Sequence, residues 1–216
     1  MIHRISEEIA YRLNENLSWV DTCVGIVKPI TYVSNGESKV IPVYFNTKRD
    51  LCSGADYLSI IPDSSKVSIA YMELNEDPEI IDINDRWVRF SSNVDLIFWF
   101  NYQKINVGMI DSDMLIANAI DSIPDYLPNS EYIGVSIDVD GISTDAERMF
   151  RKYTYNDGTM FTMYPYDFFS IRLKIQYSIM SNCSIVRSSI DECNMKPVVI
   201  TIGKDKVEVP FGVIKQ

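Results

Sequence analysis

The chain has 216 residues, of which 46% are hydrophobic, so it can bury enough apolar surface to form one domain without disulfide bonds or metal ions. Its formal net charge of −10 argues against non-specific binding to nucleic acid or to anionic membranes, since both need clustered Lys and Arg. The longest apolar run, Leu96 to Phe100, is far shorter than the roughly 18 residues that a membrane-spanning helix needs, so we expect a soluble protein made inside the cell.

The N-terminal part of the chain predicts a helix and then a β-hairpin. Apolar residues recur at helical spacing at Ile2, Ile5, Ile9 and Leu13. Thr22 to Val33 is rich in β-branched residues, and Lys39 to Phe45 follows it after Asn35-Gly36, a pair that supplies the positive φ angles of a tight turn. Pro42 predicts that the second strand lies at a sheet edge, because proline has no N–H to donate to a neighbouring strand.

Two more strands are predicted in the middle of the chain. Val67, Ile69 and Tyr71 alternate with Ser68, Ala70 and Met72, and the polar stretch Asn75 to Asp85 then interrupts the pattern. In the segment Asp95 to Gln103, one face carries Leu96, Phe98, Phe100 and Tyr102, and the other carries Ile97 and Trp99. Because both faces are apolar, we expect this strand to be central and covered on both sides.

A second helix is predicted from Ser112 to Ile123. Its apolar stripe consists of Leu115, Ile116, Ala119, Ile120 and Ile123. Asp111 or Ser112 is suited to cap its start, and Pro124 should end it.

The rest of the chain predicts further strands. We expect a strand at Tyr132 to Asp138, a short charged segment at Ala146 to Arg151 and a turn at Asn156 to Gly158. In the next strand, Phe169, Ile171, Leu173, Ile175 and Tyr177 should point inward, with Ser170, Arg172, Lys174 and Gln176 pointing outward. Pro197 to Ile202 and Lys206 to Val209 predict a C-terminal hairpin. The fold class predicted from this order is α+β, with an antiparallel sheet packed against about two helices.

Residues that would support catalysis are scarce. The single histidine, His3, lies at the start of the chain, so a Ser-His-Asp or Cys-His nucleophile has no base, and the glycine-rich phosphate-binding motifs and G-x-S-x-G are absent from the sequence. The four cysteines are widely spaced without a C-x-x-C pair, and are Cys23, Cys52, Cys183 and Cys193. We interpret them as reduced, buried thiols, and predict no catalytic residue and no cofactor.

One acidic cluster has two interpretations. Asp138, Asp140, Asp145 and Glu147, with Gly141 in a turn, offer oxygen ligands for a hard cation such as Ca²⁺ or Mg²⁺. Their spacing does not fit an EF-hand loop. We favour an acidic turn that leads into a helix capped by Ser143 or Thr144, and therefore predict no metal site.

Aromatic residues make up 12% of the chain and leave three interpretations open. The C-terminal half has a run of them, at Tyr153, Tyr155, Phe161, Tyr164, Tyr166, Phe168 and Phe169, near Met160 and Met163. These residues can form strand core, or a protein interface that uses large rigid rings and adaptable methionines. Together with Trp19, Trp87 and Trp99, they also suit an alternative function as a carbohydrate- or receptor-binding β-rich module.

The order of elements resembles the tail-terminator and neck-ring proteins of tailed bacteriophages, including the ring proteins of crAss-like phages. The segments that carry the resemblance are Met1 to Leu13, Asp95 to Gln103, Ser112 to Ile123 and Tyr164 to Tyr177. It covers roughly residues 1–178, and the chain departs from smaller members by the extension Ser181 to Gln216.

The resemblance implies a non-enzymatic virion protein. Residues 1–180 would form the ring-forming domain, and residues 181–216 would be either part of the same domain or an arm that clasps a neighbouring subunit. The implied partners are further copies in a closed ring of about six or twelve, the adjacent ring, portal or tail proteins, and genomic DNA that passes through the lumen without specific binding. Edge strands such as Lys39 to Phe45 would pair with the next copy.

Overall fold

The computed structural model describes residues 1–34, 36–45, 56–62, 64–84, 87–105, 111–127, 133–154, 162–180, 198–202 and 205–209. The helices are α1 (Ile2–Asn16), α2 (Ser112–Asp121) and α3 (Ala146–Phe150). The strands are β1 (Cys23–Ser34), β2 (Glu37–Tyr44), β3 (Asp56–Ser59), β4 (Ser68–Leu74), β5 (Glu79–Ile83), β6 (Trp87–Asn101), β7 (Ile133–Ser143), β8 (Tyr166–Met180), β9 (Val198–Ile202) and β10 (Asp205–Val209). The predicted α+β class is confirmed.

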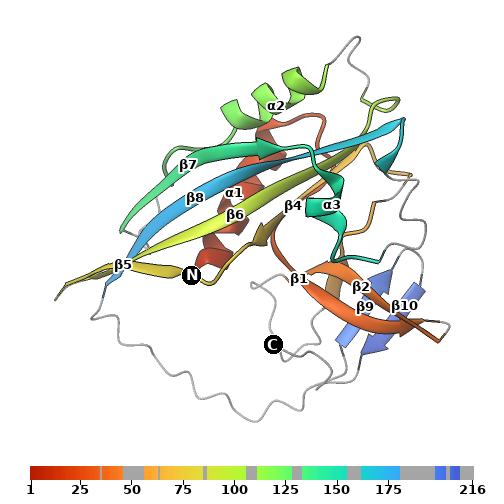
Figure 1. Ribbon diagram of the computed structural model, residues 1–216, viewed down its shortest axis with the longest axis horizontal. Coiled ribbons are helices and arrows are strands. Elements are labelled where there is room, and N and C mark those ends of the chain that lie inside the picture. The colour runs from red at the N-terminus through yellow and green to blue at the C-terminus, as the bar shows by residue number, and fades with distance from the viewer. Residues whose placement is uncertain are drawn as a thin grey trace.

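The described strands form one mostly antiparallel sheet (Figure 1). Their order is β10-β9-β3-β2-β1-β4-β6-β8-β7, and β5 pairs with the first part of β6. The two longest strands, β6 and β8, pair along their whole length, from Trp87 opposite Met180 to Asn101 opposite Tyr166. β1 runs parallel to β4, and β3 runs parallel to β9.

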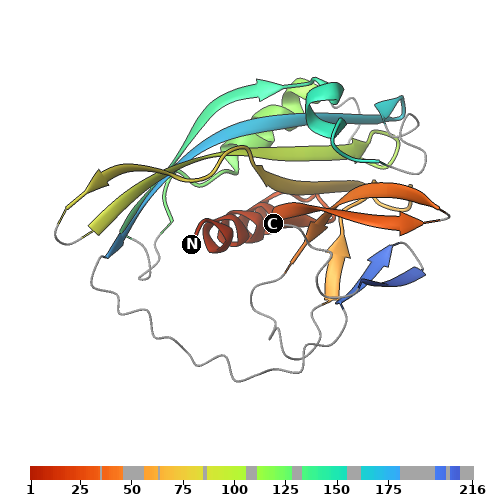
Figure 2. The same cartoon turned by 60° about the horizontal axis from the view of Figure 1, so that its bottom comes forward.

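The larger core lies between one face of the sheet and the two longer helices. Ile5, Ile9 and Leu13 of α1 are completely buried, as the helical spacing of these residues predicts. They pack against the apolar faces of β4, β6 and β8 in a cluster that also contains Leu115 and Ala119 of α2. Figure 2 shows α1 beneath this face of the sheet.

A smaller core covers part of the opposite face. Ile97 and Trp99 of β6 are buried there, together with Met149 and Phe150 of α3. The prediction that this strand is covered on both faces is therefore confirmed. The strand is longer than predicted, because it begins at Trp87.

The N-terminal hairpin is confirmed, but the prediction from Pro42 is wrong. Gly36 has a φ of 80° in the turn, and Ser34 pairs with Glu37. The end of β2 is not at an edge, because its last two residues pair with β3. The carbonyl of Pro42 accepts a hydrogen bond from the N–H of Ile60, the residue after β3, at 2.9 Å. Pro42 therefore connects β2 to the β3 segment through its carbonyl, although it has no N–H to donate.

Other predicted segments show further differences. The stretch Asn75 to Asp85 does not merely interrupt the sheet, because it contains the fully exposed strand β5. β7 extends through Asp138, Asp140 and Gly141 to Ser143, so these residues do not form a turn. The cap of α3 is Asp145 rather than Ser143 or Thr144, and its carboxylate accepts from the N–H groups of two residues in the first helical turn.

The remaining predictions fall into two groups. The second helix, capped by Asp111, the inward-facing set of β8 and the C-terminal hairpin are confirmed, and β9 joins that hairpin to the main sheet through β3. The turn at Asn156 to Gly158 lies outside the described residues, as do Cys52, Cys183 and Cys193. Among the described helices, none has the length and apolar character needed to cross a membrane.

Candidate functional site

The first feature of functional interest is a projecting hairpin, which we call the β5 arm and define as residues 75–84 with Trp87–Phe90 of β6. Every residue of β5 is exposed, and the strand extends beyond the body of the sheet (Figures 1 and 2). Its large apolar side chains are also exposed, by 53% at Ile80, 41% at Ile81, 66% at Ile83 and 38% at Trp87. Exposed apolar residues gathered in one place indicate an interaction surface.

Backbone and polar contacts hold the arm together. Asn84 closes the turn, since its N–H donates to the Trp87 carbonyl at 3.0 Å and its side-chain oxygen accepts from the Trp87 N–H at 2.9 Å. The register of β5 against β6 shifts between Ile80 and Asp82, which places one extra residue, Ile81, in the strand. The described residues thus order the arm without covering Ile80, Ile81, Ile83 or Trp87.

The second feature is a row of charged side chains that crosses three strands on the face covered by α3. Glu73 of β4 lies opposite Asp95 of β6, and Asp95 lies opposite Arg172 of β8. The two acids are only 6% and 9% exposed. Two carboxylates this close and this buried need cations and hydrogen-bond donors to offset their lost hydration.

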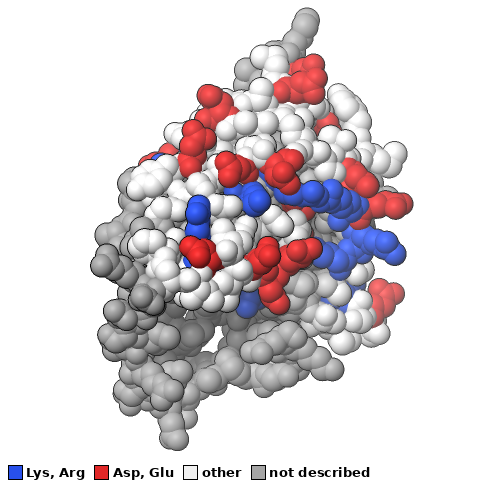
Figure 3. Space-filling view, turned by 60° about the vertical axis from the view of Figure 1, so that its left-hand side comes forward, with Lys and Arg blue, Asp and Glu red and all other residues white. Residues whose placement is uncertain are grey.

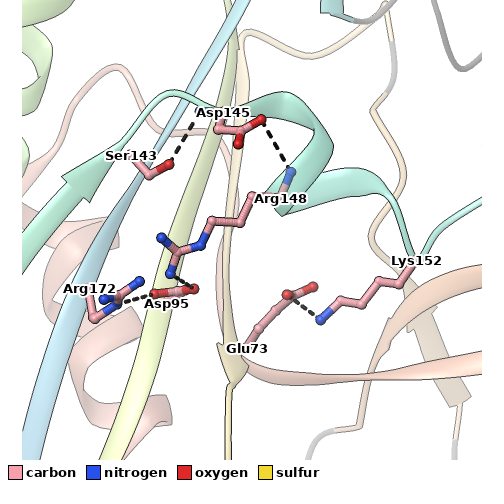
Figure 4. Close-up of polar contacts among 7 residues, drawn as sticks. All are labelled: Glu73, Asp95, Ser143, Asp145, Arg148, Lys152 and Arg172. Carbon is pink, nitrogen blue, oxygen red and sulfur yellow. Dashed lines mark hydrogen bonds and ion pairs between the residues drawn. The ribbon is translucent and has the colours of Figure 1, made fainter.

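The cations come from β8 and from α3 and the residues after it (Figure 4). Asp95 is paired with Arg172 Nε at 3.5 Å and with Arg148 Nη2 at 3.6 Å. Glu73 is paired with Lys152, and accepts a hydrogen bond from the hydroxyl of Tyr153. The charged row therefore fastens α3 and the segment after it to the sheet, in addition to the apolar contacts of Met149 and Phe150.

The row changes the acidity of one of its carboxyl groups. Burial raises the pKa of Glu73 above its usual value, and the nearby charge of Asp95 adds to this effect. Lys152 and the Tyr153 hydroxyl act in the opposite direction, because both stabilise the ionised carboxylate.

The spaces around the row differ in size. A cavity of about 70 Å³ lies between Asp95, Arg148 and Arg172, well below the roughly 300 Å³ of a small ligand site. A wider, open recess of about 740 Å³ lies at α3. Its described lining residues are all charged, and are Asp145, Glu147, Arg148, Arg151 and Lys152. A recess of this kind suits contact with a polar or charged surface.

The residues of the predicted acidic cluster are not brought together as cation ligands. Asp138 and Asp140 are exposed on β7, Asp145 caps α3, and Glu147 is exposed in the first turn of that helix. Among the described residues, no group of three or more His, Cys, Asp or Glu side chains is placed to hold a metal ion. The predicted acidic turn is also wrong, because a strand passes through it.

The aromatic residues divide between core and surface. Trp99 is 1% exposed, and Trp19 is 8% exposed with its indole N–H donating to Asn118 Oδ1 at 2.9 Å, so neither offers a face to a sugar. Trp87 is exposed and belongs to the β5 arm. In the later aromatic run, Tyr153, Phe168 and Phe169 are buried, whereas Met163 and Tyr164 are exposed. Tyr155, Met160 and Phe161 lie outside the described residues.

Neither the β5 arm nor the charged row was predicted as a site from the sequence. A sequence signal existed for the row, since Glu73 and Asp95 each interrupt an apolar strand. The arm had a weaker signal, three isoleucines within an acidic stretch. No protein-family model, curated protein or solved structure matches the chain.

Proposed function

We propose that the protein is a non-enzymatic structural subunit of a tailed-bacteriophage virion, which forms a closed ring in the neck or tail, joins portal to tail and surrounds the DNA channel. The observation that carries the proposal is the β5 arm, on which four large apolar side chains, Ile80, Ile81, Ile83 and Trp87, are between 38% and 66% exposed. A projecting arm of this kind is covered when subunits assemble, and burial of its apolar surface stabilises the assembly.

Two further properties support an assembly role. The resemblance of the element order to tail-terminator and neck-ring proteins supplies the virion context. The net charge of −10 suits a ring through which DNA must pass without being retained, since an acidic lumen repels phosphate groups. A closed ring requires contacts between two different surfaces of the subunit, so that each copy binds the next by rotation.

The experiment is the mass of the purified protein in solution, measured by light scattering, alone and then with candidate portal or tail components. We expect a discrete ring of about six or twelve copies, or a shift to such a ring on mixing. A persistent monomer in the presence of every such component would contradict the proposal.

Variants of the arm make the experiment specific. The triple variant Ile80→Ser, Ile81→Ser, Ile83→Ser should remain folded, because these side chains are exposed in the single chain, but it should fail to assemble. Met114→Ser is a matched control, since Met114 is 60% exposed on α2, away from the arm. Loss of assembly in the control as well would show that the arm has no special role.

A further inference from the structure

We infer that the β5 arm of one copy docks onto the positively charged surface beside α3 of the next copy. We call this surface the basic patch and define it as Arg148, Arg151, Lys152 and Arg172. The inference rests on the proposed ring assembly and names the two subunit surfaces that meet in it.

The arm carries an excess of acid as well as exposed isoleucines. The arm contains four acids, Glu76, Asp77, Glu79 and Asp82, and one cation, Arg89. Glu76, Asp77 and Glu79 are exposed, and none of them forms an ion pair with another residue that the structure describes. Asp82 lies opposite Arg89, whose guanidinium donates to Gln176 Oε1 at 2.8 Å. Within the described ranges, the arm therefore presents carboxylates without ion-pair partners beside its apolar side chains.

The basic patch presents the opposite charge because its acids lie underneath. The side chains of Arg148 and Lys152 are 44% and 45% exposed, and that of Arg172 is 35% exposed. Taken without their backbone atoms, the Asp95 and Glu73 side chains that pair with them are only 12% and 7% exposed. Solvent and any docking surface therefore meet the cations first.

Other features of the patch fit the arm. Arg151 is exposed and has no ion-pair partner within the described ranges. Ile142 is 50% exposed and lies beside Arg172 at the end of β7. The open recess of about 740 Å³ at α3 is lined by Arg148, Arg151 and Lys152 of the patch. Two acids, Asp145 and Glu147, also line the recess, but the carboxylate of Asp145 is engaged in capping α3. Figure 3 shows Lys and Arg gathered over one part of the surface, with Asp and Glu around them.

The arm cannot reach the patch of its own chain. Arg89 lies opposite Asp82 in the arm, and Asp95 pairs with Arg148 of the patch. These two residues are six positions apart on the continuous strand β6, which separates them by about 20 Å. The arm and α3 also lie toward opposite ends of the sheet (Figure 1). Opposite charges fixed at two distant places on one subunit are matched when the subunits join head to tail, which is the contact that a closed ring needs.

The test compares variants with altered charge by sedimentation velocity over a range of concentrations. The arm variant is Glu76→Lys/Glu79→Lys, and the patch variant is Arg148→Gln/Arg151→Glu, which leaves Asp95 its pair with Arg172. Glu37→Lys/Asp121→Lys changes the net charge as much as the arm variant does, at exposed positions elsewhere. We expect the arm and patch variants each to weaken self-association at least about 10-fold, since like charges across an interface oppose docking. The control should associate as the unaltered chain does.

The combined arm and patch variant should recover association, because its charges are again complementary. A second measurement needs no variant: self-association of the unaltered chain should weaken as NaCl is raised, since salt screens charges at the contact. Three results would overturn this inference and leave the ring proposal standing. They are assembly that neither variant weakens, a combined variant that does not recover assembly, and assembly that is insensitive to salt. An unaltered chain that stays monomeric at every attainable concentration, with and without portal or tail components, would overturn both.

Discussion

The contact between α1 and β1 at Gly25 gives a prediction about stability. A Cβ atom at this position would lie 2.8 Å from Ser6 Oγ and 3.2 Å from the backbone nitrogen of Glu7. Ser6 Oγ is buried, donates to the His3 carbonyl at 2.7 Å and accepts from the Ile26 N–H at 3.1 Å. Gly25→Ala must therefore displace α1 or break the hydrogen bond to Ile26.

The cost of this substitution has two parts. A buried N–H that loses its acceptor costs about 1–3 kcal/mol, and overpacking of a well-packed site costs about as much again. We expect the free energy of unfolding to fall by about 2–6 kcal/mol, measured by urea denaturation with tryptophan fluorescence.

Gly141→Ala is the matched control, because no atom of the other described residues, its two chain neighbours aside, lies within 4 Å of a Cβ at that position. It should change stability by less than about 1 kcal/mol. In a Ser6→Ala background, Gly25→Ala should cost less than in the unaltered chain, since the nearest contact has been removed. Equal stabilities of the Gly25→Ala and Gly141→Ala variants would refute this account of how α1 packs.

Three further predictions concern the charged row and the buried thiol. Burial raises the pKa of Glu73, so the contribution of this group to stability is full below the unfolded pKa of about 4.5 and is lost as pH rises through the folded pKa. The free energy of unfolding, measured by urea denaturation from about pH 4 to 8, should therefore depend less on pH in Glu73→Gln than in the unaltered chain. An unchanged pH dependence would contradict this prediction. Asp95→Ala should lower the free energy of unfolding by only about 1–2 kcal/mol, because Arg148 and Arg172 are each a third or more exposed and can turn to solvent. A loss of about 3–5 kcal/mol, the size expected for a fully buried ion pair, would contradict this prediction. Burial raises the pKa of the Cys23 thiol, so with the other three cysteines replaced by serine, a thiol reagent should react only after unfolding, and rapid reaction of the folded protein would show that Cys23 is accessible.

The sequence predicted those elements whose burial is periodic. α1 and β8 each bury one set of side chains at regular spacing, and their predicted inward faces are confirmed at Ile5, Ile9, Ile171 and Leu173. β6 was recognised because its two faces are apolar over Leu96 to Phe100. In these elements the apolar pattern and the tertiary contacts agree.

Elements whose side chains are not buried left no such pattern. β5 is exposed along its whole length, so its residues follow no alternation of apolar and polar positions, and its backbone pairing with β6 is the reason that it is a strand. The start of β6 was missed for a similar reason, since Trp87 and Arg89 are exposed. The edge prediction from Pro42 failed because its carbonyl, rather than an N–H, makes the contact to the next strand.

The charged row could not be assembled from the sequence because its members come from four separate segments. Only the register of β4, β6 and β8 places Glu73, Asp95 and Arg172 side by side. The buried carboxylates then hold Arg148 and Lys152 close to the sheet, so the position of the basic patch depends on acids that the surface scarcely shows. It follows that removing either carboxylate should loosen these cations and weaken docking of the β5 arm as well as stability. Changes at Ile80, Ile81 and Ile83 of the arm, in contrast, should alter assembly alone, because these side chains are exposed in the single chain.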